Sequence, residues 1–276
     1  MKNIGTKIAA VAFLLLATPA FAGKGGSAQK IQSAISSHSV DAIIAEVERA
    51  EGLACGECIQ LITNLTEDSR YEVREVAAWW FAKRPAMAKM LAQGFVQDLG
   101  NGGSIAVRNA ADFLGATITF TSLPSLRTAI TRGDINVEAK TALVRAVKTL
   151  AHIDGNFVLL TAMGDADAGV RAAAANAWRE IRGQTSASPV VALLADSDAT
   201  VRAEAATVVG AMLDATARPS LERLVATDAS PIVRRNAAWA LGKLGQSASR
   251  DVLTAATSDS SGLVRMVAKA ALATLR

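Results

Sequence analysis

Two cysteines, Cys55 and Cys58, form the one group of side chains in this sequence that could carry out chemistry at close range. At the start of a helix, residues three apart bring their sulfur atoms close enough to bridge. Two interpretations follow: a local structural disulfide, or a redox-active dithiol whose position at a helix start favours the reactive thiolate. No βαβ pattern of the thioredoxin kind surrounds the pair, and Ile59 stands where a haem-attachment motif needs His.

The remaining residues do not form the sets of side chains that metal-dependent or hydrolytic enzymes use. A zinc site needs about four ligands, whereas the two histidines, His38 and His152, are far apart in the sequence. Neither is followed by Glu, so the His-Glu pair of metal-dependent hydroxylases is missing, and no Ser/His/Asp set or phosphate-binding glycine loop is evident. We therefore expect no metal, no cofactor and no enzymatic activity.

Three large residues in succession, Trp79, Trp80 and Phe81, are the second unusual feature. On a helix they span about 200°, so they cannot all face one core. Trp79 and Trp80 either pack in the core or expose one ring as a binding anchor. Trp80 is kept as a candidate partner contact.

The elements that position these residues are indicated by an internal repeat. Val-Arg pairs recur with gaps of 34, 63, 31, 32 and 31 residues, at Val73-Arg74, Val107-Arg108, Val170-Arg171, Val201-Arg202, Val233-Arg234 and Val264-Arg265. The double gap brackets a degenerate copy around 135–144, aligned on Val137-Glu138. Such a period is typical of helical solenoids, with about seven units here.

Other positions repeat at the same offsets. An Asp stands five residues before the Val, at Asp68, Asp165, Asp196, Asp228 and Asp259. Small pairs follow at offsets four and five, and a larger apolar residue follows at eight: Phe81, Trp178, Val209, Leu241 and Leu272. Offsets 0, 4 and 8 lie on one helical stripe, so each unit is a helical hairpin, such as 189–195 and 200–212. We expect the Asp side chain to accept hydrogen bonds from the free backbone N–H groups at the start of the second helix. We expect Gly115, Gly210 and Gly242 to end second helices.

The pattern Asp-x4-Val-Arg-x2-Ala-Ala-x3-Leu-Gly, best preserved at 228–242, resembles the short HEAT-like repeat of phycocyanobilin lyases. The resemblance covers about residues 54–276 and implies an all-α, right-handed α-solenoid of about seven hairpins. It also implies that the Arg column bonds to Asp residues of neighbouring repeats. The expected structural ladder is Asp68, Arg74, Asp165, Arg171, Asp196, Arg202, Asp228, Arg234, Asp259 and Arg265.

The first residues predict export. Lys2 and Lys7 precede an apolar run from Ile8 to Ala17, and Ala20-Phe21-Ala22 is a small-residue cleavage site. The run is shorter than the roughly 18 residues of a membrane anchor. We expect a signal peptide (1–22), a flexible linker (23–29), capping helices (30–53) and the solenoid (54–276), with the mature protein in the periplasm or extracellular and without stable membrane insertion.

Charge is uneven along the chain. Loss of Lys2 and Lys7 lowers the net charge from +4 to +2, which argues against nucleic acid as a partner. Residues 23–100 hold eight Lys/Arg against ten Asp/Glu, whereas 217–276 hold nine against four.

A monomeric, non-catalytic scaffold that binds a protein with an acidic patch is the favoured function, and a thiol-redox or cofactor-handling protein using Cys55 and Cys58 is the alternative. Candidate contacts on the concave second-helix face are Glu75, Trp80, Asn109, Asp112, Arg235, Asn236 and Lys269.

Overall fold

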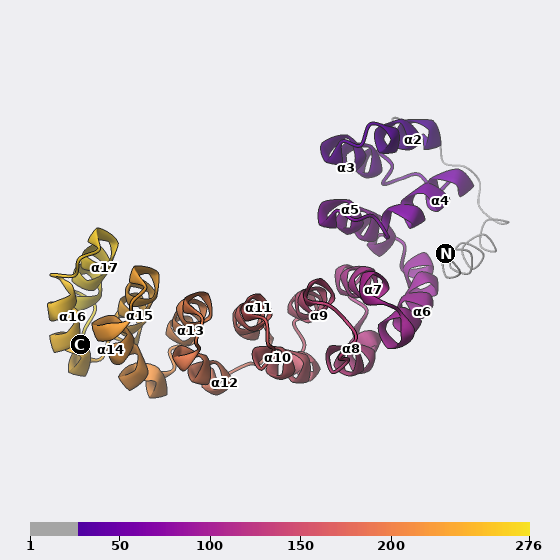
Figure 1. The fold of residues 1–276 in the computed structure, drawn as a ribbon. Coiled ribbons are helices and arrows are strands. Elements are labelled where there is room, and N and C mark those ends of the chain that lie inside the picture. The colour runs from indigo at the N-terminus through magenta and orange to yellow at the C-terminus, as the bar shows by residue number, and fades with distance from the viewer. Residues whose placement is uncertain (1–26) are drawn as a thin grey trace. The chain divides into compact units, whose positions relative to one another are not determined.

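A computed structural model describes residues 27–276, and these residues form an all-α structure of sixteen α-helices packed as sequential hairpins (Figure 1). This is a HEAT-like α-solenoid, as the repeat predicts. The predicted signal peptide and residues 23–26 of the predicted linker lie outside the described residues. Within 27–276, no helix combines the length and apolar character that a bilayer span requires.

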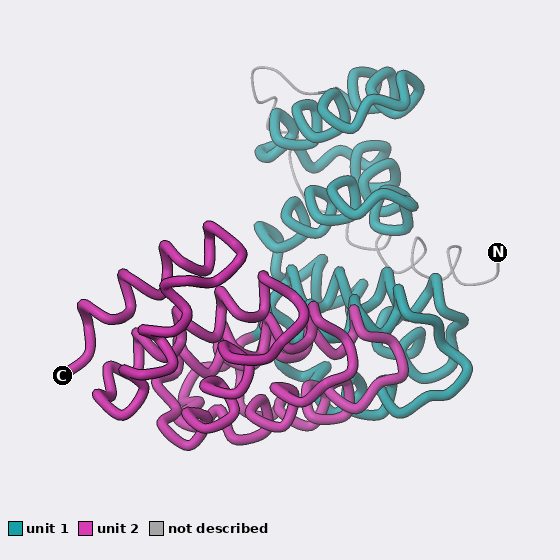
Figure 2. Tube along the Cα trace, turned by 60° about the vertical axis from the view of Figure 1, so that its left-hand side comes forward, with its two compact units in different colours: residues 1–150 teal, residues 151–276 magenta. Residues whose placement is uncertain are grey.

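The chain divides into two compact units, one ending at Leu150 and the other comprising Ala151–Arg276 (Figure 2). The described part of unit 1 contains a short 3-10 turn at Phe120–Ser122 and eight α-helices. These are α2 (Ala28–Ser36), α3 (Val40–Arg49), α4 (Gly56–Leu65), α5 (Tyr71–Ala82), α6 (Pro85–Asn101), α7 (Ser104–Ala116), α8 (Leu123–Ile130) and α9 (Val137–Leu150).

Unit 2 contains four hairpins, and in each the first helix is shorter than the second or is partly 3-10. Its α-helices are α10 (Asn156–Met163), α11 (Ala168–Trp178), α12 (Ser188–Val191), α13 (Ala199–Ala211), α14 (Arg218–Thr227), α15 (Pro231–Leu244), α16 (Arg250–Ala256) and α17 (Gly262–Leu272). The segment Ala192–Ala195 continues α12 as a 3-10 turn. Second helices α11, α13, α15 and α17 pack side by side and form one layer (Figure 1).

The first two helices of unit 1 cover the end of its stack. Ser27 and Ser39 are their N-caps, accepting hydrogen bonds from the backbone N–H groups of Lys30 and Ala42. Helix α2 therefore begins at Ala28, two residues before the expected start. Helix α3 packs against α5 and α2 against α4, so the apolar side chains Ile43 and Val47 are buried between hairpins.

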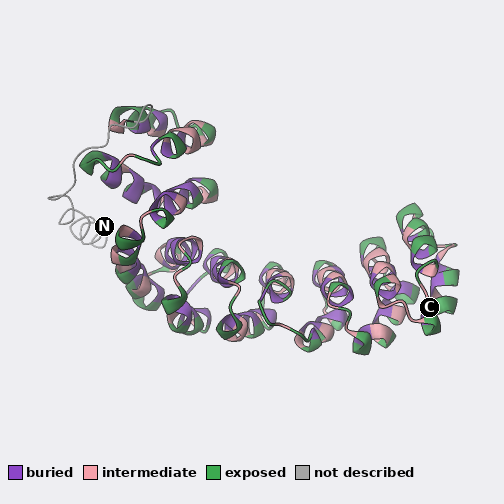
Figure 3. Cartoon of the chain, turned by 180° about the vertical axis from the view of Figure 1, so that it is seen from behind, coloured by how far each residue is buried: buried purple, intermediate pink, exposed green. Residues whose placement is uncertain are grey.

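Figure 3 shows that buried residues lie where neighbouring helices meet. The repeated Val column belongs to this core in both units, and it is fully buried in all six aligned copies: Val73, Val107, Val170, Val201, Val233 and Val264. The large apolar residue at offset eight is also buried, except that Leu272 is half-buried. The alignment of the degenerate copy on Val137 is wrong, because Val137 is 46% exposed. Ala139 is fully buried in its place, which puts Lys140 in the Arg column and Asp134 in the Asp column.

The expected role of Gly115, Gly210 and Gly242 as helix-ending residues is also wrong. All three lie inside second helices. A Cβ on Gly210 would come within 2.7 Å of the Cα of Ala240, and one on Gly242 within 2.7 Å of the Cβ of Ala271. Glycine here allows close approach of successive second helices. Left-handed residues at or just beyond the helix ends, Ile118, Leu213 and Gly245, turn the chain instead.

Candidate functional site

An Arg–Asp ladder joins successive hairpins of unit 2. Arg202 donates from Nε and Nη2 to the two carboxylate oxygens of Asp228, at 2.7 and 3.1 Å. Its Nη1 donates to the backbone carbonyls of Asp196 and Ser197, at 2.8 and 2.9 Å. The same arrangement pairs Arg171 with Asp196 and Arg234 with Asp259. Each guanidinium therefore ties the turn of its own hairpin to the turn of the next.

The Asp of each turn also organises the entry to the second helix, but not as its N-cap. Asp196 accepts from the N–H of Asp198 at 2.8 Å, and it is Asp198 that caps α13. The hydrogen bond from Arg171 holds the pKa of Asp196 below its ordinary value, and that from Arg234 lowers the pKa of Asp259 to about 2. These carboxylates are structural groups that stay ionised over a wide pH range.

The ladder changes partners in unit 1 because Gly102 occupies the Asp position of the second hairpin. Arg74 instead donates to Asp112 at 2.7 Å, and Arg145 donates to the other oxygen of the same carboxylate at 2.7 Å. Arg74 and Asp112 are both buried. Asp112, expected as a partner contact, is therefore the shared buried anion of an ion triad with Arg74 and the partly exposed Arg145.

The single tyrosine of the chain joins this triad to the surface. The guanidinium of Arg145 lies 4.3 Å from the centre of the Tyr71 ring, and the Tyr71 hydroxyl donates to Glu75 at 3.0 Å. Burial, together with the Glu75 carboxylate, raises the pKa of Tyr71 to about 12. Of the expected contacts, Glu75 and Asp112 thus meet through Tyr71 and Arg145, two residues that the sequence analysis did not single out.

The expected contact surface must be corrected at three positions. Trp80 is fully buried, and its indole N–H donates to the carbonyl of Ala50 at 2.8 Å. Asn109 and Asp112 are 3% and 7% exposed, so neither can serve as an open contact. Of the two alternatives for Trp80, core packing is therefore the one that the structure shows, because the chain at the end of α3 lies against the ring.

The remaining expected contacts of unit 2 lie on or beside a mixed apolar and basic surface. Ile232 on α15 and Leu263 and Met266 on α17 are 57%, 57% and 61% exposed. Ile232 and Leu263 occupy the same repeat position on two helices that pack together. We call this the α15–α17 surface and define it by Ile232, Arg235, Trp239, Leu263, Met266 and Lys269.

The charged side chains of the α15–α17 surface are all positive. The two helices contain five Lys or Arg residues and no Asp or Glu. Arg234 is engaged in the ladder, whereas Lys269 is exposed and Arg235 is half-buried against Asn236. Asn236 donates to Ala203 and Thr207 of α13, so it fixes the helix spacing. Arg235 and Lys269 remain as basic groups beside exposed apolar side chains.

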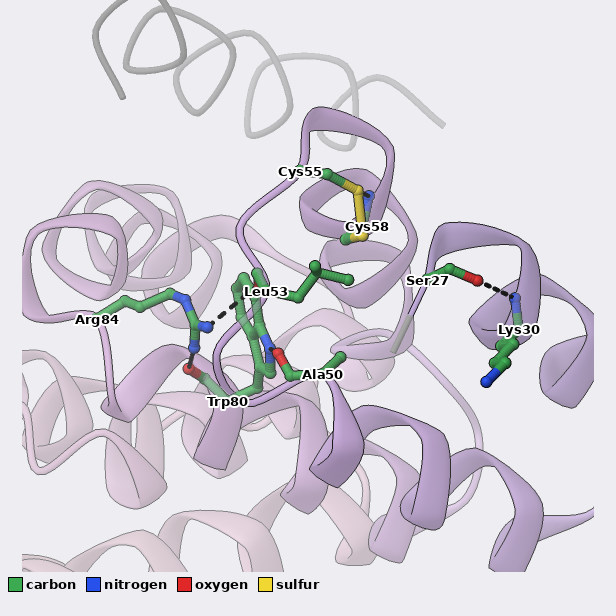
Figure 4. Close-up of a disulfide and its surroundings, with 8 residues drawn as sticks. All are labelled: Ser27, Lys30, Ala50, Leu53, Cys55, Cys58, Trp80 and Arg84. Atoms are coloured by element: carbon green, nitrogen blue, oxygen red, sulfur yellow. Dashed lines mark hydrogen bonds between the residues drawn. A yellow bond between two sulfur atoms is a disulfide. The ribbon is translucent and has the colours of Figure 1, made fainter. Parts of the chain in front are cut away.

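The second candidate site is the Cys55–Cys58 disulfide at the start of α4, with a Cα–Cα distance of 5.1 Å (Figure 4). Cys55 is the N-cap of α4 and its sulfur accepts from the N–H of Cys58 at 3.2 Å. Cys55 is exposed, whereas Cys58 is fully buried. The closed loop is so short that chain-entropy estimates give a stabilisation of about 2 kcal/mol.

Trp80 and Arg84 hold the chain segment that leads to Cys55 (Figure 4). Arg84 lies over the Trp80 ring at 3.4 Å and donates to the carbonyls of Glu51 and Leu53. With the bond from Trp80 to Ala50, three backbone carbonyls between 50 and 53 are fixed by α5 and the loop after it. Among residues 27–276, no group of three or more His, Cys, Asp or Glu side chains could hold a metal ion.

Comparison with known proteins agrees with this fold. Residues 187–273 match the family model for HEAT repeats. Across the whole chain, the fold is similar to that of the Escherichia coli protein YibA, with 16% identity, 100% of this chain and 97% of that chain covered, and a TM-score of 0.59. It is also similar to Kap95p in complex with RanGDP, with 12% identity, 99% of this chain and 41% of that chain covered, and a TM-score of 0.60.

A weaker likeness connects the chain to the CpcE–CpcF complex of phycocyanin lyase from a Nostoc species, with 18% identity, 78% and 86% coverage and a TM-score of 0.42. No curated protein sequence matches this chain. At these identities the similarities describe the fold alone. HEAT repeats form a scaffold that generally serves protein interaction, and fold by itself does not assign an activity.

Proposed function

We propose that this protein is a non-catalytic, exported scaffold that binds a protein partner through the α15–α17 surface. The observation that carries the proposal is the combination of three large apolar side chains, each more than half exposed, with basic groups and no acidic group on the same two helices. Exposed apolar clusters rimmed by polar groups are typical of interaction sites. The occupant that fits is a short segment with apolar side chains next to Asp or Glu.

Each part of the surface has a different task. Ile232, Leu263 and Met266 supply the apolar area whose removal from water provides most of the binding free energy. Met266 adapts its shape to a partner because its side chain is unbranched. Arg235 and Lys269 attract the acidic residues of the segment, which speeds association and makes binding sensitive to salt.

The ladder explains why this surface is rigid. Arg234 fixes the turn before α15 to Asp259, which precedes α17. The two helices therefore present Ile232 and Leu263 at a constant spacing, and little conformational entropy is lost in ordering them on binding. In unit 1, the ion triad of Arg74, Asp112 and Arg145 connects neighbouring hairpins in a similar way.

Selection from a random peptide library displayed on phage tests the proposal. The wild-type protein should enrich peptides with Asp or Glu next to Leu, Ile or Phe, and high salt should weaken their binding. A variant with Leu263→Asp and Met266→Asp should lose these peptides. Leu160→Asp, at an exposed position on α10, is the matched control and should keep them. Peptides without acidic residues, or peptides bound equally by the double variant, would refute the assignment.

A further inference from the structure

The two residues of the Cys55–Cys58 disulfide differ in exposure to solvent. Cys55 is exposed at the tip of the loop before α4, whereas Cys58 is fully buried one turn into the helix. An external thiolate can reach Cys55 in the folded protein but cannot reach Cys58. An incoming group would therefore attack one defined sulfur.

The position of Cys55 also favours its departure as a thiolate. It is the N-cap of a ten-residue helix, and its sulfur accepts from the backbone N–H of Cys58 at 3.2 Å. Backbone N–H groups and the helix dipole stabilise negative charge at this position. Cys55 is the leaving group when a mixed disulfide at Cys55 is resolved, and a stabilised leaving thiolate makes that second step of an exchange faster.

The chain around the disulfide is also held by contacts other than the disulfide. Trp80 and Arg84 hold the carbonyls of Ala50, Glu51 and Leu53 from α5 and the residues that follow it. Helix α4 is fixed independently by Cys58, Ile59 and Ile62, which are buried in the hairpin core. We therefore expect the loop and the helix to keep their places when the disulfide opens, as a reaction site requires.

We propose that Cys55–Cys58 is a thiol–disulfide exchange site that oxidises a pair of thiols in a protein or peptide substrate. A substrate thiolate attacks the sulfur of Cys55, the Cys55–Cys58 bond breaks, and Cys58 leaves as a thiolate that takes a proton from solvent. The second substrate thiolate then attacks the substrate sulfur of the mixed disulfide, and Cys55 leaves. The substrate dithiol loses two electrons and becomes a disulfide, while Cys55 and Cys58 gain them as two thiols. This inference is independent of the α15–α17 surface.

Single-cysteine variants test the asymmetry. In Cys58→Ser, the Cys55 thiol should react rapidly with an aromatic disulfide reagent, and its rate should level off at lower pH than that of free cysteine. In Cys55→Ser, Cys58 should react roughly 100-fold more slowly, because a buried thiol must wait for local opening. Equal rates in the two variants, each with the circular dichroism of the wild type, would overturn the proposal.

Exchange by the unmodified protein provides the second measurement. The wild type is mixed with a reduced peptide that contains two cysteines, and thiols on both molecules are alkylated and counted by mass spectrometry. We expect oxidised peptide and reduced protein in equal amounts under native conditions, and a mixed disulfide through Cys55 when Cys58→Ser reacts with the same peptide in oxidised form. If the wild-type disulfide opens only in urea, the bond is structural and the proposal fails.

Discussion

Removal of one guanidinium from the ladder should destabilise unit 2 by an amount that its contacts define. Arg202 makes two charge-assisted bonds to Asp228 and two bonds to backbone carbonyls. The Asp228 side chain is only 5% exposed, so Arg202→Met leaves a nearly buried carboxylate without its cation. Breaking such a pair costs about 3–5 kcal/mol.

Arg265 provides a matched control at the same repeat position. Its Nη1 donates to the carbonyls of Asp259 and Ser260, at 2.7 and 3.0 Å, and no carboxylate among the described residues pairs with it. Its side chain is exposed, so water can replace both bonds. Arg265→Met should therefore cost about 1 kcal/mol or less.

Urea unfolding followed by circular dichroism measures both variants. The difference between them isolates the carboxylate pair, and adding Asp228→Asn to Arg202→Met should recover part of the loss because the orphaned charge is gone. If Arg202→Met and Arg265→Met lower the free energy of unfolding equally, the ladder does not contribute through its ion pairs and the reasoning is wrong.

Three further perturbations test other contacts. Gly210→Ala should lower the stability of the folded protein by about 1–2 kcal/mol, because the overpacking penalty against Ala240 exceeds the gain in helix propensity. Gly262→Ala should leave the stability unchanged or raise it, because the added Cβ meets nothing closer than 3.5 Å. Thermal unfolding of the two variants tests this difference. The pKa of Asp259 is lowered to about 2 in the folded protein, so the stability that this carboxylate contributes is present above its unfolded pKa and is lost as the pH falls from about 4 to about 2. Across this pH range, the urea midpoint of the wild type should fall more than the midpoint of Asp259→Asn. Absorbance titration of Tyr71 should show ionisation near pH 12, and Glu75→Gln should shift it downward because a nearby negative charge is removed; no change would show that Glu75 does not act on the ring.

Much of the fold could be predicted because small and branched residues recur at helical spacing in each repeat. The Val column, the Ala pairs and the Asp before each second helix led to the hairpins, and the resemblance to a known repeat implied the Arg–Asp ladder that the structure shows in unit 2. The degenerate copy was misaligned because Val137 resembles the column more closely than Ala139 does. Only burial distinguishes them, since Ala139 is fully buried and Val137 is exposed.

The contact residues were less predictable, because exposure depends on what the neighbouring hairpin places over each offset. Trp80, Asn109 and Asp112 were kept as candidate contacts, yet all three are buried in the structure. Ile232, Leu263 and Met266 resemble core residues in the sequence, and only the stacked helices show that they face outward.

The sequence by itself determined the helical class and the hairpin period, because these depend on local spacing and residue type, and its resemblance to a known repeat implied the Arg–Asp ladder. The tertiary structure decided the partner of Arg74, the task of the helix glycines and the unequal exposure of Cys55 and Cys58. Those outcomes depend on the close packing of side chains that are far apart in the sequence, which a local sequence pattern does not predict.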